Sequence, residues 1–291
     1  MRYHGTVIRP PSEADSYIVQ VTYGCAHNGC TFCGTYQDKP FQSRPADDVL
    51  ADIRTAAEIM PYTRRVFLAD GNALVLSTPR LIRILDALDE NFPHLQRVGT
   101  YANAQDLLHK SHDELSSLCH RGLKIVYLGL ESGSDEVLRR IEKGSTSAEM
   151  IEAVHRAQSA GIKVSVIGIL GIAGPELSAV HAEETGRVVS EMGPRYLSML
   201  TLMLVPGTPL EQQWRAGQFE LMEPESLLAE LRQVIHHLNC RSGCVFRTNH
   251  ASNYLPLAGT LPKDKQRLLA TLDAALTQGP GVLRPEHWRG L

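Results

Sequence analysis

The sequence predicts an α/β fold in which parallel strands alternate with helices. Six strand-like runs, rich in β-branched and other apolar residues, recur with little of the polar alternation of a half-exposed strand. Helix-like runs lie between them, so right-handed crossovers should wind the strands into a parallel sheet or barrel. Six units are too few for the eight-stranded barrel, and we therefore expect an open or partial (β/α)6 barrel.

Local signals set the boundaries of these elements. The strands are expected at Tyr17–Thr22, Arg65–Ala69, Arg97–Tyr101, Lys124–Leu130, Lys163–Leu170 and Tyr196–Leu204. Prolines suit first helical turns, Ser or Thr followed three residues later by Glu fits a capping box, and glycines stand where helices should stop. The residues with these signals are Pro45 and Pro79, the pairs Ser111–Glu114 and Thr146–Glu149, and the glycines Gly122 and Gly161.

The chain continues beyond the sixth strand with a different pattern. Two helices are expected at Pro224–Asn239 and Pro262–Gln278, separated by an irregular run, Cys240–Leu261. We interpret residues 1–220 as the barrel. Residues 221–291 then form a mainly helical C-terminal extension that closes the barrel and is not an independent domain.

Composition excludes several classes of protein. Of 291 residues, 43% are hydrophobic and 21% charged, which is ordinary for a globular fold. The net charge of −3, without a long basic run, argues against a broad surface for nucleic acid. No apolar run is long enough to span a bilayer, and Met1–Pro10 has no apolar signal core. We expect a cytoplasmic protein with no membrane contact; its oligomeric state is open.

Three of the six cysteines crowd into nine residues, at Cys25, Cys30 and Cys33. They follow the first predicted strand, which places them at the C-terminal end of a parallel barrel, where active sites lie. Three thiolates in such a loop can hold one iron–sulfur cluster and leave one iron open. Two alternatives are a zinc site with His27 as a fourth ligand and structural cysteines without a metal.

This segment resembles the cysteine signature of the radical S-adenosylmethionine (SAM) superfamily. The family spaces its three cysteines by three and then two residues, with an aromatic residue before the last, which here is Phe32. The first gap of this chain holds four residues, 26–29, and we expect it to bulge without changing the cluster. The resemblance implies a radical-SAM-type barrel with a [4Fe–4S] cluster at Cys25, Cys30 and Cys33, and SAM as cofactor.

A later run, Val205–Leu210, is similar to a B12-related branch of that superfamily. Cys25 comes too early to follow an N-terminal cobalamin-binding domain, and the sequence has no Asp-x-His-x-x-Gly motif. We therefore expect a short, cobalamin-independent member of the branch.

The resemblance also implies where SAM binds. Asp70, Gly71 and Asn72 stand where the family meets the methionyl amino group; a plain Asp-Gly turn is the alternative. Glu131, followed by Ser132, stands where an acidic residue accepts from the ribose hydroxyls.

Two further contacts are implied. Lys143 is the first choice and Arg139 the second for pairing with the SAM carboxylate, although each alone also fits a solvated helix face. Gly168 and Ile169 on the fifth strand are candidates for adenine, which backbone hydrogen bonds and flat apolar contacts recognise.

The catalytic residues are open, with Cys244, Tyr101 and His250 as candidates. His236, Cys240 and Cys244 recur at every fourth position and would share one face if the helix continued, so whether they form a second metal site is open. Packed thiols are the alternative.

The implied activity is the reductive cleavage of SAM to a 5′-deoxyadenosyl radical that takes a hydrogen atom from a small-molecule substrate. Such an oxidoreductase or transferase needs an electron donor of the flavodoxin or ferredoxin type. The substrate is open. Alternatives are a non-catalytic zinc-binding protein and a cluster enzyme that cleaves SAM to an aminocarboxypropyl radical.

Overall fold

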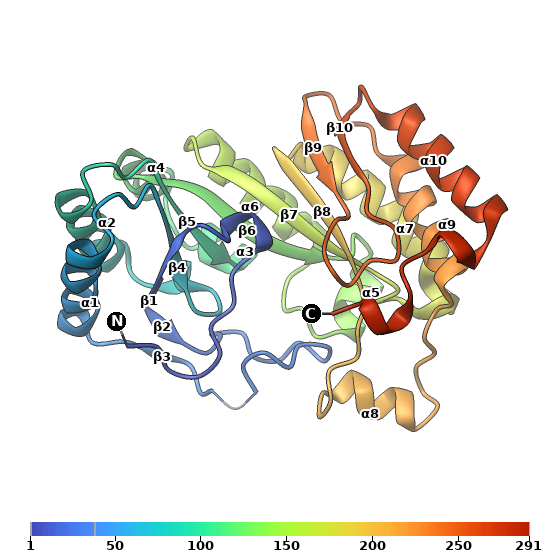
Figure 1. Ribbon diagram of the computed structural model, residues 1–291, viewed down its shortest axis with the longest axis horizontal. Helices are drawn as coiled ribbons and strands as arrows, with labels where there is room; N and C mark the ends of the chain where they lie inside the picture. Colours follow the sequence, from blue (N-terminus) through green and yellow to red (C-terminus); the bar gives the residue numbers. More distant parts are fainter. Residues whose placement is uncertain (1, 38, 291) are drawn as a thin grey trace. The chain divides into compact units, whose positions relative to one another are not determined.

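The computed structural model describes residues 2–37 and 39–290 and divides into two compact units (Figure 1). The first unit takes in the described residues up to Asn28, Thr35–Leu128 and Glu152–Val164. The second takes in Gly29–Gly34, Gly129–Ile151 and the described residues from Ser165 onward. In the described part of the chain, no helix has the length and apolar character needed to span a membrane.

The first unit is built on parallel strands. Their order is β1 (Tyr17–Gln20), β4 (Arg65–Ala69), β5 (Arg97–Ala102) and β6 (Leu123–Glu131), and the last residues of β6 belong to the second unit. A short antiparallel pair, β2 (Thr22–Tyr23) and β3 (Gln42–Ser43), follows β1. The helices are α1 (Ala46–Ile59), α2 (Thr78–Asn91), α3 (Ala104–Leu108), α4 (His112–His120) and most of α6 (Ser147–Ser159), with single 3-10 turns at Pro11–Glu13 and Ala73–Val75.

The predicted helix signals form as hydrogen bonds. The Glu114 amide donates to Ser111 Oγ over 3.1 Å, and the Ser111 amide donates back to the Glu114 carboxylate over 2.9 Å, which satisfies two otherwise unpaired amides. Thr146 and Glu149 make the same reciprocal pair. Pro79 lies in the first turn of α2, whereas Pro45 stands one residue before α1.

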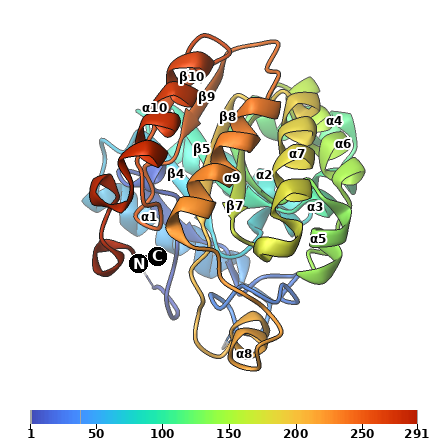
Figure 2. The same ribbon diagram turned by 90° about the vertical axis from the view of Figure 1, so that its right-hand side faces the viewer.

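The second unit continues the βα pattern. In it β7 (Lys163–Leu170), whose first two residues belong to the first unit, pairs parallel with β8 (Tyr196–Thr201). β8 pairs parallel with β9 (Cys244–Arg247), and β10 (Ala258–Leu261) is antiparallel to β9. Its helices are α5 (Asp135–Arg140), α7 (Gly174–Met192), α8 (Pro209–Arg215), α9 (Pro224–His237) and α10 (Lys265–Gln278), followed by 3-10 turns at Pro280–Val282 and Glu286–Trp288. Figure 2 shows α9 between α7 and α10, and it packs against both.

The predicted α/β class and all six predicted strands are confirmed, and β4 and β7 have the predicted bounds. The first strand divides into β1 and β2, and the last ends at Thr201. The prediction of an irregular run at Cys240–Leu261 is wrong, because β9 and β10 lie within it. Each has only four residues, too few for period-2 alternation to be read from the sequence. The boundary at residue 220 stays a prediction.

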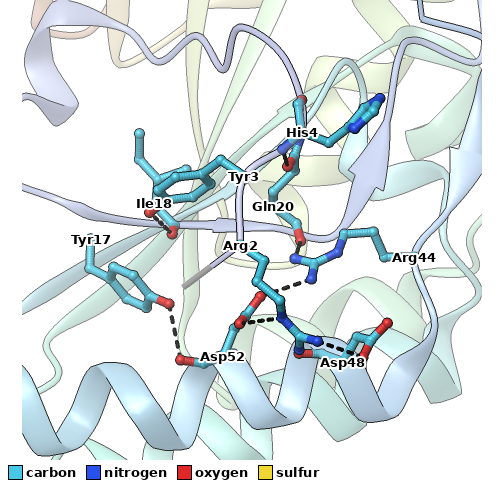
Figure 3. A network of polar contacts seen from close by, with 9 residues as sticks. All are labelled: Arg2, Tyr3, His4, Tyr17, Ile18, Gln20, Arg44, Asp48 and Asp52. Atoms are coloured by element: carbon cyan, nitrogen blue, oxygen red, sulfur yellow. Dashed lines mark hydrogen bonds and ion pairs between the residues drawn. The ribbon is translucent and has the colours of Figure 1, made fainter.

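A polar network ties the first residues of the chain to α1 in the first unit (Figure 3). Arg44 is almost fully buried and donates to the Asp52 carboxylate over 2.8 Å and to the Gln20 carbonyl over 2.7 Å. Arg2 reaches the other Asp52 oxygen over 3.2 Å and Asp48 over 3.0 Å. Burial raises the pKa of Asp52, but hydrogen bonds and charge from Arg44 and Arg2 outweigh it and hold that pKa below its ordinary value.

We expect Asp52→Asn to lower the free energy of unfolding by about 3 kcal/mol, because it leaves the buried Arg44 guanidinium without its counter-charge. Asp48→Asn is the matched control on the same helix: its carboxylate is half exposed, so the loss should be no more than about 1 kcal/mol. Urea unfolding of both variants at neutral pH measures the difference. Equal losses in the two variants would show that the buried Arg44–Asp52 pair stabilises the fold no more than the exposed Arg2–Asp48 pair does.

Candidate functional site

The first part of the site lies in the first unit, where the turn after β4 meets the loop that carries Cys25. Gly71 has φ of +40°, and a Cβ built on it would lie 2.2 Å from the Gly24 carbonyl oxygen and 2.5 Å from the Cys25 Cα. Only glycine allows the two backbones to approach this closely. The turn therefore fixes the path of the chain at Cys25.

Asn72 adds side-chain contacts to the same loop. Its Oδ1 accepts from the Ala26 amide over 2.8 Å and from the Cys25 thiol over 3.5 Å. Its Nδ2 donates to both carboxylate oxygens of Asp106, at 3.0 and 2.9 Å. Burial raises the pKa of Asp106 to about 6. Asp106 also receives the amide of Asn103 in the capping box of α3, an Asn-x-x-Asp pattern that the sequence analysis did not single out.

The Asp70 side chain contacts residues other than Cys25 and its neighbours. Its side chain is fully buried, and its Oδ2 accepts from Gln20 over 3.0 Å and from Lys39 over 3.3 Å. Its Oδ1 is buried without a hydrogen-bond partner among the described residues. The Lys39 cation offsets the carboxylate, so the Gly71 backbone and the Asn72 amide are the parts of this segment that lie against Cys25.

Cys30 and Cys33 lie in the second unit. The Cys33 amide donates to the Cys30 carbonyl over 3.2 Å, which closes a turn. Between them, the Thr31 amide donates to the Ile141 carbonyl over 3.0 Å, and the Thr31 carbonyl accepts from Leu210 over 2.9 Å. These bonds tie the turn to the end of α5 and the start of α8.

All three cysteines of this loop are half-buried thiols. Within residues 2–37 and 39–290, no three His, Cys, Asp or Glu side chains converge on a common point as the ligands of a single ion do. In an iron–sulfur cluster each thiolate binds a different iron, so convergence on one point is not required. The three thiols are thus candidate ligands, Cys25 in the first unit and Cys30 and Cys33 in the second.

Glu131 and Lys143, predicted for different parts of SAM, contact each other in the second unit. Lys143 Nζ lies 2.7 Å from Glu131 Oε1, and the side chains are only 11% and 9% exposed. A Cβ on Gly129 would lie 2.1 Å from that carboxylate oxygen, so the ion pair lies directly over this glycine. Glu131 has φ of +62°, a left-handed conformation that is unfavourable for a residue with a side chain.

The remaining SAM candidates lie in two places. Arg139 is 72% exposed and pairs with Glu136 one helical turn away, as on a solvated helix face. Gly168 and Ile169 are on β7, and a Cβ on Gly168 would lie 2.8 Å from the Met199 sulfur, so β7 and β8 are packed closely there.

A buried polar network joins Ser132 to α7 and α9 in the second unit. Ser132 Oγ lies 2.8 Å from His181 Nδ1, and His181 Nε2 lies 3.7 Å from Glu230 Oε1. Glu230 accepts from the Gly171 amide over 2.7 Å and from Ser178 Oγ over 2.5 Å. Burial lowers the pKa of His181 to about 4 and raises that of Glu230 to about 7. Sequence reasoning missed both residues.

These shifts predict a pH dependence of stability. The folded state keeps the Glu230 proton up to pH about 7, whereas the unfolded chain loses it near 4.5, so this contribution is lost as the pH rises. His181 acts in the opposite sense and removes stability as the pH falls from about 6.5 to about 4. Relative to Glu230→Gln, the wild type should lose about 1 kcal/mol between about pH 6 and 8. Chemical unfolding across this range measures it.

The control is Glu183→Gln, which removes an exposed carboxylate from α7. Its free energy of unfolding should vary with pH in the same way as that of the wild type. A Glu230→Gln profile that also parallels the wild type would contradict the raised pKa.

A cavity of about 450 Å³ lies in the second unit beyond the ends of β7 and β8. Most of its lining is apolar, and one wall is polar: Tyr254 donates to Glu286 over 2.5 Å, and Arg289 pairs with Glu286 over 2.8 Å while it covers the Tyr254 ring. The lining residues are Gly171, Leu202, Met203, Leu204, Leu221, Met222, Glu223, Pro224, Leu227, Tyr254, Glu286 and Arg289. Its size is typical of a small-molecule site.

None of the three candidate catalytic residues is among those that line the cavity. Cys244 is buried at the start of β9, where its thiol donates to Cys240, and Cys240 follows the end of α9. His236 is exposed on α9, and the described residues contain no metal-ligand group that joins it to the two thiols. Half-buried His250 contacts Ser252 over 2.9 Å. Tyr101, on β5 in the first unit, packs edge-on against Phe67.

Comparison with known proteins gives a family match. The model of the radical SAM superfamily matches residues 19–182. A tRNA-2-methylthio-N(6)-dimethylallyladenosine synthase of Pseudomonas fluorescens (strain Pf0-1) is 28% identical over 244 residues, which cover 79% of this chain and 52% of that protein. The protein of that name from Shewanella sp. (strain W3-18-1) is 24% identical over 301 residues, covering 97% and 55%. The chain spans about half the length of these relatives.

Solved structures share the fold. Coproporphyrinogen III oxidase from Escherichia coli, a radical SAM enzyme, matches with a TM-score of 0.57 and 19% identity, covering 76% of this chain and 51% of that chain. Methylornithine synthase matches with a TM-score of 0.54 and 16% identity, covering 92% and 85%. Identities this low establish a common fold and nothing about the substrate.

Proposed function

The chain belongs to the radical SAM superfamily, and from that premise we propose that it cleaves SAM reductively at a [4Fe–4S] cluster held by Cys25, Cys30 and Cys33. It is an enzyme of the radical SAM type, a family that uses a [4Fe–4S] cluster and SAM. The observation that carries the proposal is the loop of three half-buried thiols inside the matched region. A cluster held there and reduced by an external electron donor would supply the one electron that cleaves SAM to methionine and a 5′-deoxyadenosyl radical.

The protein's part is to hold the cysteine loop in place and to prevent side reactions of the cofactor. Gly71 and Asn72 fix the backbone at Cys25, and the Thr31 hydrogen bonds fix the turn from Cys30 to Cys33. The hydrogen bonds at the Ala26 amide and at Thr31 act on backbone rather than on sulfur, so they persist when the thiols ionise and bind iron.

The buried ion pair is the proposed site for the polar parts of SAM. Lys143 has a cation suited to the methionyl carboxylate, and Glu131 has an acceptor suited to the ribose hydroxyls. The two side chains neutralise each other over 2.7 Å, which avoids leaving a buried charge unpaired. SAM would exchange this pair for two charge-assisted contacts of similar strength.

We place the substrate in the cavity beyond β7 and β8. Leucine and methionine make up half of its lining residues, which favours a small molecule with an apolar part, and the Tyr254–Glu286–Arg289 wall provides polar contacts. A nucleoside within tRNA is a second candidate, favoured by the two named synthases, one of which aligns with 97% of this chain. Measuring whether added tRNA changes the rate of SAM cleavage would separate the two candidates.

Anaerobic reconstitution with iron and sulfide, followed by chemical reduction and SAM, tests the proposal. We expect brown protein and release of 5′-deoxyadenosine and methionine in equal amounts. Formation of 5′-methylthioadenosine would instead indicate the aminocarboxypropyl route. Colourless protein that binds zinc in a one-to-one ratio and leaves SAM intact would overturn the proposal.

A further inference from the structure

The turn after β6 is held by α7 through contacts that leave little freedom. A Cβ on Gly133 would lie 2.3 Å from the Glu184 carbonyl oxygen and 2.5 Å from the Thr185 amide nitrogen, so the backbone of the turn rests directly on the helix. The Gly133 amide donates to Thr185 Oγ1 over 2.9 Å. One turn earlier on α7, His181 reaches Ser132.

Hydrogen bonds fix the orientation of the His181 ring. Ser132 Oγ accepts the Ser134 amide over 3.1 Å and shares a hydrogen bond with His181 Nδ1 over 2.8 Å. His181 Nε2 points to α9, where it lies 3.7 Å from Glu230 Oε1 and has no hydrogen-bond partner among the described residues. His181 is a fully buried, neutral histidine with a definite orientation.

The strained residue stands directly before this turn. Glu131 keeps its left-handed φ of +62° although a glutamate gains nothing locally from that conformation. Such conformations persist only where the surroundings fix them. The surroundings here are Ser132, held by His181, and Gly133, held by Thr185. Together they aim the Glu131 carboxylate across Gly129 toward Lys143.

The same helices hold the end of β7. Glu230 on α9 accepts the amide of Gly171, which follows β7 with φ of +79°, and also the Ser178 hydroxyl of α7. The ends of β6 and β7 thus share one buried support made of α7 and α9.

We propose that His181 and Glu230 are positioning residues of the SAM site: they hold the strand-end turns of β6 and β7 in the conformation that presents Glu131. This rests on the proposed function, because it takes Glu131 and the β7 end as parts of that site. Neither residue needs to touch SAM. Their effect passes through Ser132 and through the Gly171 backbone.

Two variants of one residue separate positioning from mere packing. His181→Asn keeps a hydrogen-bonding group where Nδ1 stands, whereas His181→Leu fills similar space without one. We expect the Leu variant to bind SAM about tenfold more weakly than the Asn variant, which should stay within about threefold of the wild type. The readout is equilibrium binding of SAM to the anaerobically reconstituted protein, with circular dichroism to show that each variant is folded.

A second readout needs no cofactor. Amide hydrogen exchange of the segments around residues 131–134 and 171–174 should quicken in His181→Leu, and less in His181→Asn, while α1 in the first unit stays unchanged. Equal SAM affinity and equal exchange in the two variants would overturn the positioning role. Failure of the wild type itself to bind SAM would instead reject the proposed function and leave the exchange result to judge the inference.

Discussion

Cys30→Ala should leave the reconstituted protein with less iron than the wild type and with no measurable cleavage of SAM. Mutation of a residue that hydrogen-bonds to a metal ligand typically lowers metal affinity or activity by about 10–100-fold, so removal of the ligand itself should lower both by more. The same result is expected for Cys25→Ala and Cys33→Ala, because each thiolate would hold a different iron. Iron and sulfide content, visible absorption and 5′-deoxyadenosine release measure the effect.

Two controls make this result specific. Cys119→Ala removes a buried thiol from α4, outside the loop, and should keep iron and activity. His27→Ala removes the fourth ligand that a zinc site would need and should also keep iron. Iron loss in His27→Ala, or full activity in any of the three loop variants, would contradict the proposed ligand set.

Lys143→Met should weaken SAM binding by about 10–100-fold, the range that a hydrogen bond to a charged group is worth. It should also lower the free energy of unfolding by about 3 kcal/mol, because Glu131 would be left as a buried, unpaired carboxylate. Adding Glu131→Gln should restore stability without restoring affinity. That pattern would separate the role of Lys143 toward SAM from its role in the ion pair.

The matched control is Arg139→Met. Arg139 is the other cation considered for the SAM carboxylate, but it is exposed and pairs with Glu136 on its own helix. Its loss should change SAM affinity by less than about twofold, as expected for a surface ion pair. A larger loss of affinity in Arg139→Met than in Lys143→Met would reverse the assignment. Equilibrium binding of SAM to both reconstituted variants decides between them.

Sequence pattern was sufficient for elements that are long and uniformly apolar. β4 and β7 lie where their β-branched runs predicted, since a strand buried on both faces cannot be polar. β9 and β10 escaped notice because four residues are too few to show a period. They are stabilised by pairing, β9 with β8 and β10 with β9. Pairing between strands cannot be predicted from the local sequence of either strand.

The sequence was sufficient to propose the candidate ligands, but not the residues that support them. The three cysteines stand out by spacing alone, and Glu131 and Lys143 by resemblance. Glu131 and Lys143 form a buried pair because the chain takes a left-handed turn at Glu131, and no local sequence signal predicts that turn. His181 and Glu230 were missed because a histidine or glutamate on an amphipathic helix is usually expected to be exposed to solvent. Here tertiary packing buries both and gives them backbone partners.

The central claim is that the Cys25, Cys30 and Cys33 loop holds a [4Fe–4S] cluster with one iron open to SAM. Electron paramagnetic resonance of the anaerobically reduced protein, frozen with and without SAM, tests it most directly. We predict a [4Fe–4S]⁺ signal whose g values shift when saturating SAM is added. A signal of another cluster type, or a [4Fe–4S]⁺ signal that saturating SAM leaves unchanged, would contradict the claim.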